Sequence, residues 1–270
     1  MSSLRGPSHV RRAYANGSFG QIHYRRSGPE GTRSPLLLLH SLPGASYLFE
    51  SFMAEMGNDR TVIAPDFPGF GMSDAPAMAP GITGYAAALR ELETELGLGV
   101  FDIMGYHAGS AVGAELARQQ PEALRKLIMV GAPIFTAKER EEFNERFSVF
   151  GPDERAKHFE KNWQMFKANF WKMEKDAERS WYIYVDNQKN PSGLAWGLRA
   201  AISYDLESTM KEITQPLLVL NPADDLASYT PRAAGIMKNG SLKDLPEWTH
   251  GMFDAKTTEL STLVRAFLDG

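Results

Sequence analysis

Residues 101–117, FDIMGYHAGSAVGAELA, constrain the fold of this chain more than any other stretch. An apolar run typical of a buried strand leads to Gly105, and a helix-forming segment of small residues follows Gly109. A tight strand-to-helix turn crowds the backbone, which is why glycine is needed on both sides of its central residue. The central residue is then held in a strained conformation with its side chain beyond the end of the strand. The pattern therefore predicts that the imidazole of His107 projects from the edge of a sheet.

Other apolar runs have the length of buried strands and alternate with segments of helical spacing. Besides the strand and helix within 101–117, the expected strands are 35–39, 61–65, 126–130, 216–220 and 242–245, and the expected helices are 47–56, 82–96, 230–238 and 257–268. Before them, Asn16-Gly17 predicts a hairpin between strands at 10–15 and 19–25. Alternating strands and helices indicate an α/β fold with a mostly parallel sheet covered by helices on both faces.

The alternation is interrupted between Phe135 and Leu206. This segment has no buried strand run, is rich in charged and aromatic residues, and shows helical spacing with Pro152 and Pro191 as expected helix boundaries. We expect an inserted helical cap at 135–206 between two parts of one core, 1–134 and 207–270. Most of its aromatic residues should form the cap's own core, and others, with Trp163 and Phe166 as candidates, should contact a substrate.

Composition limits the function classes. The chain of 270 residues has a net charge of -4, which gives no reason to expect binding to nucleic acid or to an anionic membrane. It has no cysteine, so disulfides and thiol chemistry are excluded. Neither a long apolar span nor the apolar core of a signal peptide is present, so we expect a cytoplasmic protein. The expected partner is a small-molecule substrate, and the chain is expected to be a monomer or a homodimer.

Five motifs occur in an order that resembles the α/β-hydrolase fold superfamily, over essentially the whole chain. They are His40-Ser41-Leu42-Pro43, the loop Asp66–Asp74, the turn Gly105–Gly109, the segment Asn221–Asp225, and the segment Glu247–Phe253. The first is most similar to the loop of the capped epoxide hydrolase, haloalkane dehalogenase and C–C hydrolase branches. The resemblance implies an α/β-hydrolase fold with an inserted cap, and a hydrolytic active site at the turn.

The resemblance also implies roles for individual residues. His250 matches the catalytic histidine, and Asp225 matches the acid that orients it, with the adjacent Asp224 as the alternative. Backbone N–H groups of Leu42 and Ala108 would form the oxyanion hole. Ser41 and Tyr106, beside these loops, are expected to contact substrate. His40 is expected to hold its own loop from below.

His107 departs from the family, which has Ser, Cys or Asp at the centre of the turn. The imidazole could act as a nucleophile through an acyl-imidazole, or could form an acid/base pair with His250. A metal ion held by His107, His250 and Asp225 is a third possibility, although the fold normally needs no metal or other cofactor there. Two further possibilities stay open. The protein could be non-catalytic and bind a small ligand, or His107 could be a substitution that replaces a natural Ser or Asp.

We conclude from the sequence that the chain is a hydrolase for a small, partly apolar carbonyl compound, such as an ester, a lactone or a diketone-like substrate. The set Asp225, His250 and the oxyanion loop favours an enzyme, because a binding protein has no use for it. The alternatives are a ligand-binding protein of the same fold and a lyase or isomerase that uses acid/base chemistry.

Overall fold

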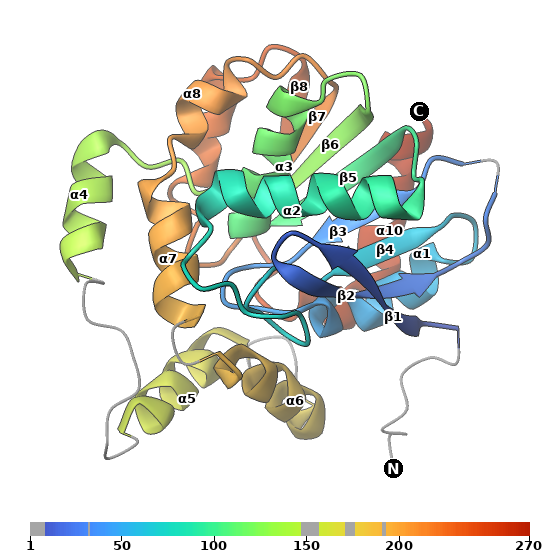
Figure 1. Cartoon of the computed structure of the whole chain (residues 1–270). Helices are drawn as coiled ribbons and strands as arrows, with labels where there is room; N and C mark the ends of the chain where they lie inside the picture. The colour runs from blue at the N-terminus through green and yellow to red at the C-terminus, as the bar shows by residue number, and fades with distance from the viewer. Residues whose placement is uncertain (1–8, 32, 147–156, 171–175, 191–192) are drawn as a thin grey trace.

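The computed structural model describes residues 9–31, 33–146, 157–170, 176–190 and 193–270. Within these residues the chain forms a single eight-stranded sheet with helices on both faces (Figure 1). The strands are β1 (Arg11–Gly17), β2 (Gly20–Ser27), β3 (Leu36–Leu39), β4 (Val62–Pro65), β5 (Phe101–Tyr106), β6 (Leu124–Val130), β7 (Leu217–Pro222) and β8 (Gly240–Leu245).

The sheet is mostly parallel, as predicted, with strand order β1-β2-β4-β3-β5-β6-β7-β8. Only β1 with β2 and β2 with β4 pair in antiparallel fashion, and β1–β2 is the predicted hairpin. From β4 to β8 every pair is parallel, so the carboxyl ends of these strands meet at one edge. Side chains that follow β3, β5, β6 and β7 can therefore gather there.

Successive residues of the central strands face opposite sides of the sheet. Leu37 and Leu39 pack in the cluster that includes buried residues of α2 and α3, whereas Leu36 and Leu38 pack in the cluster with α1 and α10. These helices are α1 (Glu50–Met56), α2 (Gly81–Leu96), α3 (Ala108–Gln119) and α10 (Thr257–Asp269). Burial on both faces explains why β3 consists entirely of leucine.

Three short helices complete the core: η1 (Ser46–Phe49), η2 (Thr230–Gly235) and α9 (Met252–Ala255), the first two being 3-10 helices. The sequence predicted a longer helix at 230–238. The observed segment is a 3-10 helix with Pro231 in its first turn. It ends at Gly235, a residue with low helix propensity, and β8 begins at Gly240.

The segment between β6 and β7 is helical where it is described, as predicted, and its role as an inserted cap stays a prediction. Its helices are α4 (Ala137–Arg146), α5 (Lys157–Phe170), α6 (Ala177–Gln188), α7 (Gly193–Ser203) and α8 (Leu206–Met210), with no strand among the described residues. Pro152 and Pro191 lie outside the described residues, and the exact limits of the cap stay a prediction. In Figure 1 α5 and α6 lie apart from the core helices α2 and α3. Large apolar side chains that stay exposed on α5 and α6 are Phe159, Trp181, Tyr182 and Val185.

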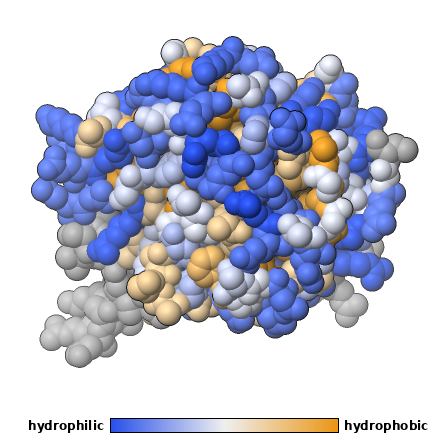
Figure 2. All heavy atoms as spheres, turned by 45° about the horizontal axis from the view of Figure 1, so that its top comes forward, coloured by the Kyte–Doolittle hydropathy of each residue, from blue (hydrophilic) through white to orange (hydrophobic). Residues whose placement is uncertain are grey.

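The face in Figure 2 is mainly hydrophilic, with hydrophobic residues in small separate groups. Among the described residues, no helix combines the length and the apolar character that crossing a membrane requires.

Asp66 fixes the loop that follows β4. Its side chain is almost completely buried and accepts hydrogen bonds from the backbone N–H of Ser46 (2.6 Å) and of Met72 (2.9 Å). Nδ1 of His23 on β2 lies 2.7 Å from the same carboxylate. Burial alone would raise the pKa of Asp66, but the bond to His23, the nearby histidines and the N–H donors lower it to about 2. The carboxylate therefore stays ionised and holds three segments together.

His40 connects this loop to the loop after β3, as predicted. Its Nε2 accepts a hydrogen bond from the backbone N–H of Phe67 (3.0 Å). Because an N–H group can only donate, Nδ1 carries the proton and donates to the carbonyl oxygen of Ser41 (2.6 Å). Burial lowers the pKa of His40, which agrees with a neutral ring. His40 is thus a structural part of the sheet edge.

We predict that the stability contributed by Asp66 depends on pH. Its folded-state pKa of about 2 lies below the ordinary value of 3.8, so this contribution is complete above pH 3.8 and is lost as the pH falls through about 2. Asp66→Asn should lower the free energy of unfolding at pH 7 by about 2 kcal/mol. Urea unfolding should show the difference between the two proteins shrinking between pH 4 and pH 2. An equal difference at every pH would contradict this assignment, and Asp74→Asn, exposed on the same loop, is the control.

Candidate active site

The predicted strand-to-helix turn is present between β5 and α3. His107 has φ 51° and ψ −113°, and it is the one non-glycine residue with positive φ among the described residues. A Cβ atom on Gly105 would lie 2.3 Å from the carbonyl oxygen of Gly109, and one on Gly109 would lie 2.1 Å from that of Leu39. Neither position can hold a larger residue unless the backbone moves. The two glycines therefore allow the turn that presents His107.

The imidazole of His107 lies against the end of β6. A Cβ atom on Gly131 would lie only 2.7 Å from Cδ2 of His107 and 3.1 Å from its Nε2. Gly131 also has φ +67°, a conformation that side chains rarely adopt. The space that the ring occupies therefore depends on glycine at this position.

One nitrogen of His107 is fixed by Asp224. The distance from Nε2 to Oδ2 of Asp224 is 2.8 Å, and the Asp224 side chain is fully buried. Its other oxygen accepts the backbone N–H of Leu226 (2.9 Å). Since an ionised carboxylate only accepts hydrogen bonds, Nε2 of His107 carries the proton, and the neutral ring has its lone pair on Nδ1.

The surroundings favour the protonated form of His107. Burial alone would lower the pKa of the ring, but the carboxylates of Asp224 and Asp225 and the hydrogen bond to Asp224 outweigh burial, so the pKa is raised. The same group of charges holds the pKa of Asp225 well below its ordinary range, because the attraction of His107 and His250 exceeds the cost of burial.

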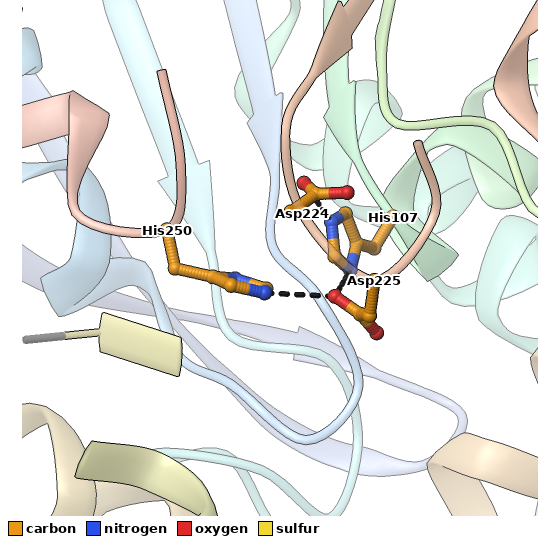
Figure 3. Close-up of side chains that lie close together, drawn as sticks. All are labelled: His107, Asp224, Asp225 and His250. Carbon is orange, nitrogen blue, oxygen red and sulfur yellow. Dashed lines mark hydrogen bonds and ion pairs between the residues drawn. The ribbon is translucent and has the colours of Figure 1, made fainter. Parts of the chain in front are cut away.

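His250 lies in the loop between β8 and α9 and faces the same place (Figure 3). Its Nε2 is 2.7 Å from Oδ1 of Asp225, and this same oxygen is 4.0 Å from Nδ1 of His107. The centroids of the two imidazole rings are 5.1 Å apart. Asp225 thus stands between two histidines, with its side chain about 60% exposed.

Tyr106, the last residue of β5, holds the other side of His250. Its hydroxyl lies 2.5 Å from Nδ1 of His250, and the residue is 1% exposed. The hydroxyl of Tyr106 can donate to Nδ1 of a neutral ring whose proton is on Nε2, and it can accept from Nδ1 when that nitrogen carries a proton. The sequence predicted a contact of Tyr106 with substrate, whereas the structure directs its hydroxyl to His250. Contact with substrate stays a prediction for this residue.

The sequence anticipated that His250 pairs with Asp225 but missed the second pair, His107 with Asp224. It treated the two adjacent acids as alternatives for one role. The sequence did contain a signal for the second pair, because it places two adjacent carboxylates and two histidines at one sheet edge, one acid for each imidazole. One nitrogen or oxygen from each of the four side chains lies within 4.8 Å of the others, so this is also the group that could hold a metal ion.

The residues predicted for the oxyanion hole belong to the same edge. Ala108 is the first residue of α3, where backbone N–H groups have no partner within the helix. Leu42 lies in the loop after β3, and its backbone packs against Gly197 of α7, where a Cβ atom would lie 2.8 Å from the carbonyl carbon of Leu42. Their role as donors stays a prediction. Ser110 points elsewhere, as expected: its buried hydroxyl donates to the carbonyl oxygen of Gly105 (2.9 Å).

The residues predicted to contact substrate occupy different places. The hydroxyl of Ser41 donates to the carbonyl oxygen of Pro43 (3.1 Å). Ser41 also lines a small pocket with residues of η1 and α6; the other lining residues are Gly44, Ala45, Tyr47, Leu48, Ile183, Asp186 and Asn187. Trp163 and Phe166 of α5 stack on each other with centroids 5.8 Å apart, and both rings contact Tyr184. These two aromatic residues pack on the cluster that includes Leu36 and Leu38 of β3, and their contact with substrate stays a prediction.

Comparison with known proteins agrees with this architecture. The chain is 30% identical over 113 residues to haloalkane dehalogenase 2 of Mycobacterium tuberculosis, covering 42% of this chain and 38% of that protein. It is 32% identical over 106 residues to 2-hydroxy-6-oxo-2,4-heptadienoate hydrolase of Pseudomonas putida, covering 38% of each. These alignments span less than half the length of the curated relatives.

Solved structures extend the likeness to the whole fold. The crystal structure of the enol-lactonase from Burkholderia xenovorans LB400 matches with a TM-score of 0.82 and 19% identity, covering 96% of this chain and 100% of that one. The epoxide hydrolase CorEH matches with a TM-score of 0.78 and 19% identity, covering 96% of this chain and 99% of that one.

A family model matches a longer part of the chain than these two relatives do. Residues 34–252, from just before β3 to the start of α9, match the model of the alpha/beta hydrolase fold. This range includes both loops, the turn at His107, the two aspartates and His250. The chain therefore belongs to the alpha/beta hydrolase fold family.

Proposed function

We propose that the protein is a hydrolase for a small, partly apolar carbonyl compound, such as an ester, a lactone or a diketone-like substrate. The observation that carries this proposal is the state of His107. Asp224 holds the proton of the neutral ring on Nε2, so the lone pair of Nδ1 points to the side where Asp225 and His250 lie. An imidazole nitrogen in that state is a ready nucleophile, and because the pKa of His107 is raised, the neutral form gains population as the pH rises.

The proposed reaction begins when Nδ1 of His107 attacks the carbonyl carbon. The oxyanion that forms accepts hydrogen bonds from the N–H groups of Leu42 and Ala108. As the bond to the leaving group breaks, protonated His250 donates a proton to it. The acylated ring of His107 now carries a positive charge, and the buried carboxylate of Asp224 stabilises that charge at Nε2.

Water completes the cycle. Neutral His250 accepts a proton from water, and the resulting hydroxide attacks the acyl carbon. The bond between carbon and Nδ1 breaks, the acid product leaves, and both histidines return to their starting states. Asp225 stabilises the imidazolium form of His250, and Tyr106 keeps the ring in place. Acyl-imidazoles hydrolyse readily, so His107 as nucleophile and His250 as base are sufficient for both halves of the proposed reaction.

The class of substrate is proposed from the relatives. Carbonyl groups occur in the substrates that two of the relatives are named for, a lactone and an oxo acid. The small pocket beside the Leu42 loop has a volume of about 10 Å³, which is room for about one water molecule, so it does not define the substrate. The partly apolar character of the substrate is the expectation from the aromatic residues of 135–206.

A second candidate is a lyase or isomerase reaction without a covalent intermediate. The observation that favours it is the symmetry of the site, in which each imidazole is backed by its own carboxylate. Two such pairs can pass a proton from one face of a substrate to the other. The two candidates differ in whether an acyl group is ever attached to His107.

We predict that His107→Ala and His250→Ala each lower kcat for ester or lactone hydrolysis by about 10²-fold or more. The double variant should be little worse than either single variant, because the two rings act as a unit. KM should change much less, since the cap and the oxyanion donors remain. The measurement is steady-state kinetics with a panel of aryl and alkyl esters and lactones. Equal turnover by wild type and His107→Ala would exclude a catalytic role and favour a ligand-binding protein.

Ser110→Ala is the matched control, because Ser110 is the nearest hydroxyl on α3 but bonds to the backbone of Gly105. It should keep most of the activity. His107→Ser tests the rest of the site, because a hydroxyl at this turn should support ester hydrolysis with His250 and an acid.

We predict that Gly131→Ala lowers activity by displacing His107. Its Cβ would lie 2.7 Å from the imidazole, so the ring must leave its hydrogen bond to Asp224. Gly81→Ala is the control, because Gly81 has the same φ of +67° but no heavy atom within 4 Å of the added Cβ. Both variants should lose about 1 kcal/mol of stability through backbone strain. Only Gly131→Ala should also lose activity, and equal losses in the two variants would contradict the packing argument.

A further inference from the structure

Hydrogen bonds orient the two histidines of the candidate site in the way that metal-binding histidines are oriented in proteins. A histidine ligand normally donates its second ring N–H to a carboxylate or another acceptor, which fixes the orientation of the ring. His107 does so through Nε2, which is bonded to the fully buried Asp224. Nδ1 of His250 lies beside the buried hydroxyl of Tyr106, which can accept its N–H in the tautomer that leaves Nε2 free to bind an ion. Both outer nitrogens are therefore held by fixed partners.

The inner nitrogens face one carboxylate. Nδ1 of His107 is 4.0 Å, and Nε2 of His250 is 2.7 Å, from the same oxygen of Asp225 (Figure 3). In a tetrahedral site with bonds of about 2.0 Å, ligand atoms lie about 3.3 Å apart. The observed separations lie on both sides of that value, so shifts of about 1 Å would adapt the set. The half-exposed side chain of Asp225 can make such a shift by rotation.

Charge also favours a cation at this place. Two adjacent carboxylates, Asp224 and Asp225, lie beside the two imidazoles. Among the described residues, the ion pairs of these carboxylates are with His107 and His250, and none is with Lys or Arg. With neutral imidazoles the group has two negative charges, which a divalent ion would balance.

We propose that His107 Nδ1, His250 Nε2 and Asp225 bind one divalent transition-metal ion of the Zn²⁺ type, and that the bound ion inhibits the hydrolase. The mixture of imidazole and carboxylate suits Zn²⁺ and Co²⁺ rather than Mg²⁺ or Ca²⁺. Binding occupies the lone pair of His107 that would attack a carbonyl group, and it occupies the nitrogen that His250 uses for proton transfer. The binding part stands on the geometry alone, and the inhibition rests on the proposed function.

Metal binding can be measured without an activity assay. The sample is untagged protein that has been treated with a chelator and then dialysed. Titration calorimetry with Zn²⁺ should show one ion bound per chain. Bound Co²⁺ should give the strong visible absorption that is typical of a tetrahedral site. His107→Ala and His250→Ala should each weaken Zn²⁺ binding by at least 100-fold. Asp224→Asn should weaken it by about 10- to 100-fold, as loss of a partner that orients a ligand does. His9→Ala, on the exposed segment before β1, should bind as wild type does.

Two results would overturn the binding site: no heat and no Co²⁺ absorption with wild type, or unchanged Zn²⁺ binding by His107→Ala. A melting curve of each variant shows that loss of binding is not loss of folding. Binding of Mg²⁺ as tight as that of Zn²⁺ would contradict the assigned ion class.

Inhibition is tested on the substrate that wild type hydrolyses best. Chelator should leave the rate unchanged, and Zn²⁺ at a concentration that saturates the calorimetric site should abolish turnover. Activation by Zn²⁺ would overturn the inhibitory role. If the protein hydrolyses no carbonyl compound, the proposed function is contradicted. The metal site is then still decided by calorimetry alone.

Discussion

The site depends on one strained turn, in which His107 is held at φ 51° where β5 ends and α3 begins. The turn is compressed against its neighbours, because both Gly105 and Gly109 lie where a Cβ atom would meet a backbone carbonyl group. The N–H group of His107 donates to the carbonyl oxygen of Val130, which ties the turn to β6. Strain of this kind persists only where the surrounding structure enforces it, and here the enforced feature is the position of one imidazole.

The arrangement of charge around that imidazole explains why two acids follow β7. Both acids lie in the turn after β7, where Asp224 is buried against His107 and Asp225 is exposed and bonds to His250. The buried acid fixes which nitrogen of His107 carries the proton, and the exposed acid accepts a hydrogen bond from Nε2 of His250. The same division of roles underlies both the proposed hydrolysis and the proposed binding of a metal ion, since each uses the lone pair on Nδ1 of His107.

The sequence predicted the features that depend on local pattern. Strand and helix alternation predicted the sheet, the glycines around His107 predicted the turn, and Asn16-Gly17 predicted the hairpin. It could not predict that Tyr106 holds His250, because the two residues are 144 positions apart and only the packing of β5 against the last loop joins them. Nor could spacing show that Trp163 and Phe166 stack within the cap, because pocket-lining and core aromatic residues have the same helical period.

The central claim is that His107 reacts covalently, and acid-quenched peptide mapping tests it most directly. Wild type and His250→Ala are mixed with an aryl ester, stopped in acid within the first turnover, digested and analysed by mass spectrometry. The account predicts an acyl group on His107 that accumulates further in His250→Ala, because the base that activates water is missing. An acyl group on Ser110 or Ser41, or no acyl group in an enzyme that turns the ester over, would contradict it.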